Sequence, residues 1–137
     1  MSRTVFASNG DAFSAPVGRR KHILCSDDHE DTREMMASLL DLWGYVVTTA
    51  GSLTETLPMV EKGDFNLLIL DGRYSDGLGV DLCKQIRRLD THTPILFLSG
   101  LAFQSDIDKG MAAGAQAYLP KPFDLDILEQ TIERLIL

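Results

Sequence analysis

The chain has 137 residues, of which 45% are hydrophobic and 24% are charged, and its formal net charge is -7. This length suits a single domain with a substantial core, and the negative charge argues against direct partners that favour Lys and Arg, namely nucleic acid and anionic membrane surfaces. No apolar run is long enough to span a bilayer, and the N-terminus lacks the charged-then-apolar order of a secretory signal. We therefore expect a cytoplasmic protein.

The two cysteines agree with a cytoplasmic location. Cys25 and Cys83 stand in apolar patterns without metal-ligand spacing, so we interpret both as small buried hydrophobes in a reducing compartment. Residues 1–20 are polar, rich in Gly, Ser and Ala, and without periodicity. They predict a flexible N-terminal tail, which leaves residues 21–137 as the folded domain.

A strand and a helix open the folded part. Apolar residues 23–25 predict the first strand. From Met35 to Trp43, apolar residues recur at helical spacing, and Gly44 follows where a helix C-cap glycine is expected. Residues 45–49 are β-branched and aromatic, which predicts the second strand.

The middle of the chain continues the alternation. Residues 53–62 predict a helix that Pro58 should kink or shorten. The continuous apolar run at 65–70 is typical of a central parallel strand buried on both faces. Residues 80–89 predict an amphipathic helix, and residues 94–98 predict the fourth strand.

The last third completes five strand–helix repeats. Ser105 resembles a helix start, so we predict a helix over 105–113. Residues 117–119 predict the fifth strand, and Asp124 caps a final helix. Strands that alternate with helices form right-handed units with a parallel sheet, so the expected fold is a three-layer, doubly wound α/β sandwich with helices on both faces.

Polar side chains follow four of the expected strands: Asp27 and Asp28, then Asp71, Ser99 and Lys121. Ligands of such folds bind at the carboxyl ends of the strands, so we expect these groups on one rim. Carboxylates about 4 Å apart repel by roughly 4 kcal/mol at an effective dielectric near 20, so some take up protons or a cation lies between them. Oxygen ligands favour Mg²⁺ over softer metals.

The same residues allow other interpretations. The adjacent Asp27 and Asp28 alone fit equally well as caps of the first helix. The turn after the first strand has no Gly-rich phosphate loop, which disfavours flavin, dinucleotide and P-loop nucleotide sites. His22, His29 and His92 fall at a strand start or in loops, so we expect solvated side chains and no Ser-His-Asp triad.

Most of the chain resembles a known protein family. Residues 22–137 resemble the receiver domain of two-component response regulators, of the chemotaxis-regulator type. The motifs that carry the resemblance occur in order: Asp27-Asp28, Asp71 at the end of Leu-Leu-Ile-Leu-Asp, Gly79, Ser99 at the end of Pro-Ile-Leu-Phe-Leu-Ser, Gly114-Ala115, and Tyr118-Leu119-Pro120-Lys121-Pro122-Phe123. The resemblance implies a five-stranded parallel sheet in the flavodoxin-like order 2-1-3-4-5.

The resemblance also implies roles for the matching residues. Asp71 resembles the phosphoacceptor, and Ser99 and Lys121 look like the groups that contact the phosphoryl oxygens. Ser99 and Tyr118 resemble the pair that switches conformation after phosphorylation. The bond between Lys121 and Pro122 is expected to be cis.

The metal ligands implied by the resemblance are the carboxylates of Asp27, Asp28 and Asp71 and the backbone carbonyl of Arg73. The metal would be Mg²⁺ or Mn²⁺, with Asp28 as a direct ligand and Asp27 acting partly through water. Phosphoryl transfer needs in-line positioning and charge cancellation, which a divalent metal and an ammonium group supply.

The implied function is a signalling switch and not a turnover enzyme. Its own chemistry would be limited to self-phosphorylation and self-dephosphorylation. The phosphoryl donor would be a histidine kinase or a histidine phosphotransfer protein. The output would pass to a protein target, or to a homodimer, through the fourth helix, the fifth strand and the fifth helix. A stand-alone regulator and the receiver portion of a longer protein both remain open.

Two departures from the family pattern lie beside Asp71. Ser75 stands where a proline is common, and the segment between Gly72 and Gly79 is rich in glycine, which predicts a more mobile loop. Arg73 either points to solvent or folds over Asp71 or Glu30, and we predict that it changes the lifetime of the phosphoryl group.

Two rival functions are weaker. A magnesium-dependent aspartyl phosphohydrolase of the haloacid dehalogenase type is expected to have a second Asp two residues after the nucleophile, where this chain has Arg73. A pseudo-receiver that acts only as a binding module has no support, because the acidic pair, Asp71, Ser99 and Lys121 are all present.

Overall fold

The computed structural model of the chain describes residues 20–137. The tail predicted for residues 1–20 therefore lies outside the described residues, except for Arg20. Five strands form the main sheet: β2 (His22–Ser26), β3 (Val46–Ala50), β4 (Leu67–Leu70), β7 (Ile95–Ser99) and β8 (Ala117–Pro120). The helices are α1 (Glu30–Leu42), α2 (Leu53–Lys62), α3 (Gly79–Leu89), α4 (Gln104–Ala112) and α5 (Leu125–Ile136).

The sheet is parallel throughout, in the order β3-β2-β4-β7-β8. This confirms the predicted order 2-1-3-4-5. The chain passes from β2 outward to β3 and then returns to β4 on the other side of β2. Ile23 consequently lies between Val47 of β3 and Leu67 of β4. The point where the strand order reverses is the usual place for a ligand site in such a sheet.

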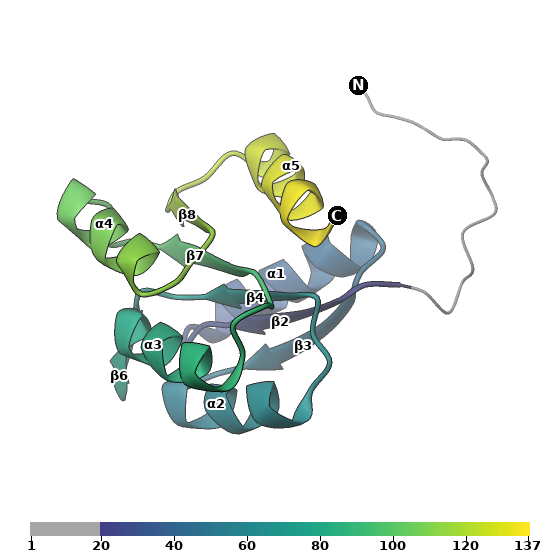
Figure 1. Cartoon of the computed structure of the whole chain (residues 1–137). Coiled ribbons are helices and arrows are strands. Elements are labelled where there is room, and N and C mark those ends of the chain that lie inside the picture. The colour runs from purple at the N-terminus through teal and green to yellow at the C-terminus, as the bar shows by residue number, and fades with distance from the viewer. Residues whose placement is uncertain (1–19) are drawn as a thin grey trace.

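Helices cover both faces of the sheet (Figure 1). On one face, Met36 and Leu40 of α1 and Leu128 and Ile132 of α5 are fully buried against the strands. On the other face α2, α3 and α4 pack over a second buried cluster. The central strands are apolar on both sides because each side is covered by helices, which explains their continuous hydrophobic runs.

Both cysteines are buried and free, as predicted from their apolar surroundings. Burial raises the pKa of the Cys25 thiol to about 12, and burial also raises the pKa of the Cys83 thiol. Burial therefore disfavours the reactive thiolate form of both Cys25 and Cys83.

Element ends agree with the sequence patterns, with a few shifts. Gly44 has a φ of 96°, as a glycine that follows a helix C-terminus does. The side chain of Asp124 accepts hydrogen bonds from the first turn of α5, as predicted. Helix α2 spans residues 53–62 with Pro58 inside it, so the expectation that Pro58 would shorten this helix was wrong.

Two further expectations about element ends were wrong, and one short element was not predicted. Helix α4 has Phe103 and not Ser105 before its first turn, because the Asp106 carboxylate accepts the Phe103 N–H. Strand β4 begins two residues later than predicted, since the side chain of Asn66 accepts the N–H of His22 in place of a continued ladder. A short antiparallel hairpin of β5 (Arg73–Tyr74) and β6 (Gly77–Leu78), which was not predicted, follows the third strand of the main sheet.

Within residues 20–137, no helix has the length and apolarity needed to cross a membrane.

Candidate functional site

Three carboxylates meet at the carboxyl ends of neighbouring strands. Asp27 directly follows β2, and Asp71 directly follows β4. Both are buried, with 4% and 6% of their surface exposed. Ligand atoms of Asp27, Asp28, His29 and Asp71 all lie within 4.8 Å of one another. The structure thus brings together the three acidic residues that the sequence predicted on one rim.

Lys121 supplies a positive charge to this cluster. Its Nζ atom lies 2.8 Å from Asp27 Oδ2 and 4.0 Å from Asp71 Oδ2. The ammonium group therefore forms its shorter ion pair with Asp27 and a longer one with Asp71. The Lys121-Pro122 peptide bond is cis, as predicted.

The Asp71 carboxyl group is electrostatically perturbed. Burial and the neighbouring Asp27 charge raise its pKa above the ordinary range, and Lys121 offsets part of this. The amide N–H of Gly72 donates to Asp71 Oδ1 at 2.7 Å and also favours the ionised form. A strand-end carboxylate with these neighbours is a chemically distinctive group and not a solvated surface charge.

The acidic cluster fits a hard divalent cation. Oδ1 of Asp28 is buried and accepts no hydrogen bond from any residue that the structure describes. His29 Nδ1 lies 3.2 Å from this atom, but its hydrogen bond goes to Asp27 Oδ1, also at 3.2 Å. A buried oxygen without a donor, next to two more carboxylates, is the donor set that Mg²⁺ and Mn²⁺ prefer.

The acidic pair does not cap the first helix in the usual way. His29 is the residue before α1, and its side chain makes no capping hydrogen bond. Asp27 Oδ1 accepts the N–H of His29, the residue before the helix, at 2.9 Å. Neither Asp27 nor Asp28 accepts an N–H from the first turn of α1. His29, expected as a surface residue, is largely exposed but lies at the edge of the cluster.

Ser99 and Tyr118 contact the same short loop. Ser99 is fully buried at the end of β7, and its hydroxyl accepts the N–H of Leu101 at 3.0 Å. The hydroxyl of Tyr118 donates to the carbonyl of Leu101. The Tyr118 ring packs on Phe97 with ring centroids 5.5 Å apart. A movement of the Ser99 loop would therefore reach Tyr118 directly.

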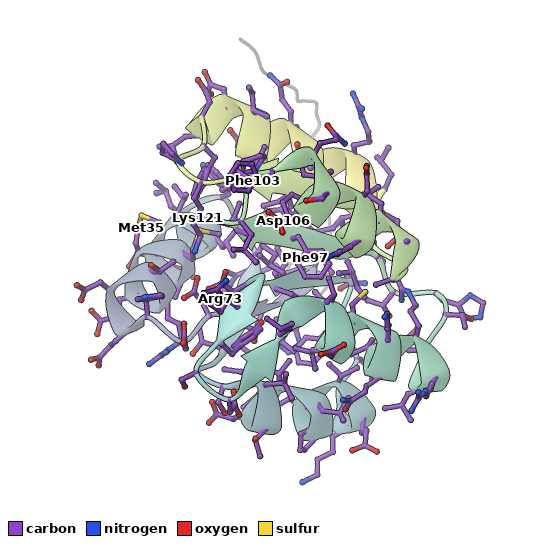
Figure 2. All side chains as sticks on the ribbon, turned by 90° about the vertical axis from the view of Figure 1, so that its left-hand side faces the viewer. Met35, Arg73, Phe97, Phe103, Asp106 and Lys121 are labelled. Carbon is purple, nitrogen blue, oxygen red and sulfur yellow. The ribbon has the colours of Figure 1, made fainter. Side chains whose placement is uncertain are left out.

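The cluster opens to solvent through a depression of about 470 Å³. Its lining includes Asp28, Asp71, Arg73, Ser99 and Lys121. Figure 2 looks onto this edge of the sheet and shows Arg73 and Lys121 together there. The Arg73 side chain is exposed and forms no ion pair with any carboxylate among residues 20–137.

The loop after Asp71 holds functional contacts that the sequence analysis missed. The N–H of Ser75 donates to Asp28 Oδ2 at 2.9 Å, a bond that the common proline at this position cannot make. The Asp76 carboxylate accepts the amides of Leu53 and Thr54, both at 3.0 Å. These partners lie more than 20 residues away in the sequence, so no local pattern reveals them.

Gly79 is explained by a close approach of backbone to backbone. A side-chain Cβ at this position would lie 2.0 Å from the carbonyl oxygen of Asp71. Only glycine lets the start of α3 come this near to the residue after β4. The glycine that the sequence motif includes is therefore a packing requirement of the site.

Comparisons with known proteins agree with this geometry. A family profile described as the response regulator receiver domain matches residues 23–133. The chemotaxis protein CheY of Pseudomonas aeruginosa is 31% identical over 116 residues, which cover 82% of this chain and 94% of that protein. The nisin biosynthesis regulatory protein NisR of Lactococcus lactis is 33% identical over 111 residues, which cover 81% of this chain.

Solved structures show the same fold. The non-phosphorylated receiver domain of HemR from Leptospira biflexa matches with a TM-score of 0.80 and 32% identity, over 85% of this chain and 94% of that one. A CheY-like receiver domain protein from Methanospirillum hungatei matches with a TM-score of 0.79 and 30% identity, with the same coverage of both chains. The chain spans 48% of the length of NisR and 25% of the length of ZraR from Salmonella typhimurium.

Proposed function

Because the chain belongs to the family of response regulator receiver domains, we propose that it is a signalling switch in which Asp71 accepts a phosphoryl group. The observation that carries this proposal is the position of Asp71. It is a buried carboxylate at the end of a central strand, within reach of two more carboxylates and of the Lys121 ammonium group.

The donor would be the phosphohistidine of a histidine kinase or of a histidine phosphotransfer protein. A carboxylate oxygen of Asp71 attacks the phosphorus, the N–P bond breaks, and the imidazole leaves with the electron pair of that bond. The product is an acyl phosphate on Asp71. The attacking group is the ionised carboxylate, the form that Lys121 and the Gly72 N–H favour against the opposing effects of burial and Asp27.

Separate residues of the cluster would hold the metal ion, supply positive charge and donate a hydrogen bond to the phosphoryl group. Asp27, Asp28 and Asp71, with the backbone carbonyl of Arg73, would hold Mg²⁺ or Mn²⁺, which when bound cancels charge on the phosphoryl oxygens. Lys121 brings a positive charge to the same edge, 4.0 Å from Asp71. The Ser99 hydroxyl lies at the neighbouring strand end, where it would donate to a phosphoryl oxygen.

The output would follow from the loop at Leu101, which both Ser99 and Tyr118 contact. When the Ser99 hydroxyl turns to the phosphoryl group, its bond with the Leu101 amide is lost. The Tyr118 hydroxyl is bonded to the carbonyl of the same Leu101, so its ring would move with the loop. The surface of α4, β8 and α5 would then change shape for a protein target or a second copy of the chain.

The surroundings of the site suit a protein donor. Met35 on α1 and Phe103 at the start of α4 are large apolar residues with 47% and 79% of their surface exposed. Figure 2 shows both on the edge that also carries Arg73 and Lys121. A docked kinase or phosphotransfer protein would cover such side chains, which are otherwise left in water.

The test uses acetyl phosphate as a small phosphodonor. We expect the wild-type chain, with Mg²⁺, to gain the mass of one phosphoryl group by intact mass spectrometry, and to gain none after a chelator is added. Asp71→Asn should gain nothing under either condition. The proposal fails if wild type gains no phosphoryl group, which would leave a binding module, or if Asp71→Asn gains as much as wild type.

A further inference from the structure

The backbone amide of Asp71 is held by a side chain three residues further along. Strand β4 ends at Leu70, and the next N–H, that of Asp71, donates to the phenol oxygen of Tyr74 at 3.0 Å. The Tyr74 side chain reaches this place because the β5–β6 hairpin turns it inward, while Arg73 before it points outward. The Tyr74 phenol thus contacts the backbone of Asp71, the proposed phosphoacceptor.

The phenol is one member of a directed chain of hydrogen bonds. Thr56 Oγ1 lies 2.7 Å from the Ser52 carbonyl oxygen, so its single proton must point there. Thr56 therefore accepts from Ser26 Oγ at 2.6 Å, and Ser26 accepts from the Tyr74 hydroxyl at 2.8 Å. The chain runs from the Asp71 amide through three hydroxyls to the residue that caps α2.

Water does not reach this chain. Tyr74, Ser26 and Thr56 have 3%, 1% and 0% of their surface exposed. The hydroxyl protons of Thr56 and Ser26 each have one acceptor, whereas the Tyr74 hydroxyl also lies 3.3 Å from a second acceptor, the Ser26 carbonyl oxygen. Solvent offers no replacement partner when one of these hydroxyls is removed. Burial raises the pKa of Tyr74, so the phenol stays protonated and keeps the direction of the chain fixed.

We propose that the Tyr74 hydroxyl is a positioning group for phosphorylation, which fixes the backbone of Asp71 through its amide and thereby the direction of the carboxylate. This rests on the proposed function of Asp71. The Gly72 N–H binds Asp71 Oδ1 at 2.7 Å, so the nucleophile is held from its own amide on one side and from the next amide on the other. In-line attack on phosphorus depends on such positioning.

The arrangement also places α2 in the same network. Thr56 of α2 sets the direction of the hydroxyl chain, although it lies outside the depression that opens to solvent. Loss of the Thr56 hydroxyl should consequently affect Asp71 in the same way as loss of the phenol, through Ser26 and Tyr74.

The first experiment compares Tyr74→Phe with wild type and with Tyr45→Phe. Phenylalanine keeps the ring in place and removes only the hydroxyl. Tyr45 is a half-buried tyrosine that packs against the core far from the site and serves as the matched control. We expect Tyr74→Phe to lower the rate of phosphorylation by acetyl phosphate and Mg²⁺ about fivefold to tenfold, and Tyr45→Phe to leave it unchanged.

The second experiment uses two substitutions of Thr56. Thr56→Val keeps the shape and removes the hydroxyl, whereas Thr56→Ser keeps the hydroxyl and removes a methyl group. If the hydroxyl chain positions Asp71, Thr56→Val slows phosphorylation severalfold and Thr56→Ser does not. A purely structural role would instead make the rate follow the melting temperatures of the two variants, which are measured in parallel.

Nuclear magnetic resonance gives a readout that does not need phosphorylation. We expect the amide proton of Asp71 to shift upfield in Tyr74→Phe and in Thr56→Val, and to stay in Thr56→Ser and Tyr45→Phe. A wild-type rate in Tyr74→Phe overturns the positioning role whether or not the resonance shifts. If wild type itself takes up no phosphoryl group, the proposed function fails first, and a shifted Asp71 resonance shows that the hydrogen bond exists without that role.

Discussion

The Arg73 side chain lies beside Asp71 and has no ion-pair partner among the described residues. It is the first residue of β5, it is exposed, and it lines the depression that also contains Asp71 and Lys121. Among the described residues it has no ion pair, so neither Asp71 nor Glu30 holds it. The guanidinium group is therefore available to a phosphoryl group at Asp71.

We predict that Arg73→Ala shortens the lifetime of phosphorylated Asp71 by about twofold to fivefold, because an exposed charge pair stabilises by up to about 1 kcal/mol. The guanidinium would shield the phosphoryl group from water. Decay is followed by intact mass after the donor is removed. Arg88→Ala on α3 is the matched control and should decay as wild type does. An unchanged lifetime in Arg73→Ala would exclude this role.

At the scale of elements, the hairpin after β4 connects the site to α2. Its residue Asp76 accepts the amides of Leu53 and Thr54 and the hydroxyl of Thr54. These hydrogen bonds lower the pKa of the Asp76 carboxyl to about 2. The glycine-rich sequence of this loop predicted mobility, whereas the structure gives the loop a two-stranded pairing and a carboxylate bound at the start of a helix.

We predict that Asp76→Ala lowers the melting temperature at pH 7 by a few degrees, because two amides at the start of α2 lose their acceptor. The folded-state pKa is lower than the ordinary value, so the ionised carboxylate stabilises the fold above about pH 4. This difference from the alanine variant should disappear as the pH falls through about 2.

Asp64→Ala is the control for this prediction, since Asp64 is an exposed loop carboxylate without a side-chain hydrogen bond among the described residues. Melting is measured by circular dichroism from pH 2 to pH 7. Equal melting temperatures of Asp76→Ala and wild type at pH 7 would show that the loop is held by Tyr74 and Ser75 alone.

Elements with periodic patterns were predictable, and contacts between distant loops were not. The strand order and helix α2 follow from apolar runs and resemblance, and Asp124 is recognisable as a cap from its place before an amphipathic run. The hairpin of β5 and β6 was missed because two-residue strands leave no alternation to read. The start of α4 was misplaced because Ser105 is a good cap in isolation, but Asp106 binds the chain one turn earlier.

Some residues of the site were likewise predictable from the sequence, and others were not. Asp27, Asp71 and Lys121 were predictable because strand ends converge in a parallel sheet. The hydroxyls of Ser26 and Tyr74 were not, since a serine in a strand and a tyrosine in a loop have no pattern that identifies them as partners 48 residues apart.

At the scale of the whole molecule, the acidic cluster opposes the stability of the fold. Asp71 and Asp27 are buried side by side, and burial together with this neighbour raises the pKa of Asp71. A folded-state pKa above the ordinary value means that the folded chain binds a proton more readily than the unfolded chain. Stability is therefore lost as the pH rises from about 4 through the raised pKa.

We predict that Asp71→Asn, without divalent metal, melts about 3 °C above wild type at pH 7, because it removes a buried charge beside Asp27. The gain should shrink toward zero as the pH falls to about 4, where the wild-type carboxyl is protonated. Mg²⁺ should raise the melting temperature of wild type more than that of Asp71→Asn, since a cation that binds the folded chain stabilises it.

The control for this prediction is Asp64→Asn, which removes an exposed carboxylate at the other end of the strands. Scanning calorimetry with chelator and with Mg²⁺ gives two melting temperatures for each of the three proteins. A lower melting temperature of Asp71→Asn in chelator at pH 7 would mean that the ionised carboxylate stabilises the fold through Lys121 and Gly72.

The contacts of the hairpin after β4 require a fixed number of residues between Asp71 and Asp76, the residue that binds α2. Three consecutive residues reach three different places: Tyr74 contacts the Asp71 amide, Ser75 contacts Asp28, and Asp76 contacts α2. One inserted residue would displace the chain by up to about 3.5 Å, more than the length of a hydrogen bond. Engineered insertions or fusion points in this protein therefore belong elsewhere, because no new alignment of this segment keeps all three contacts.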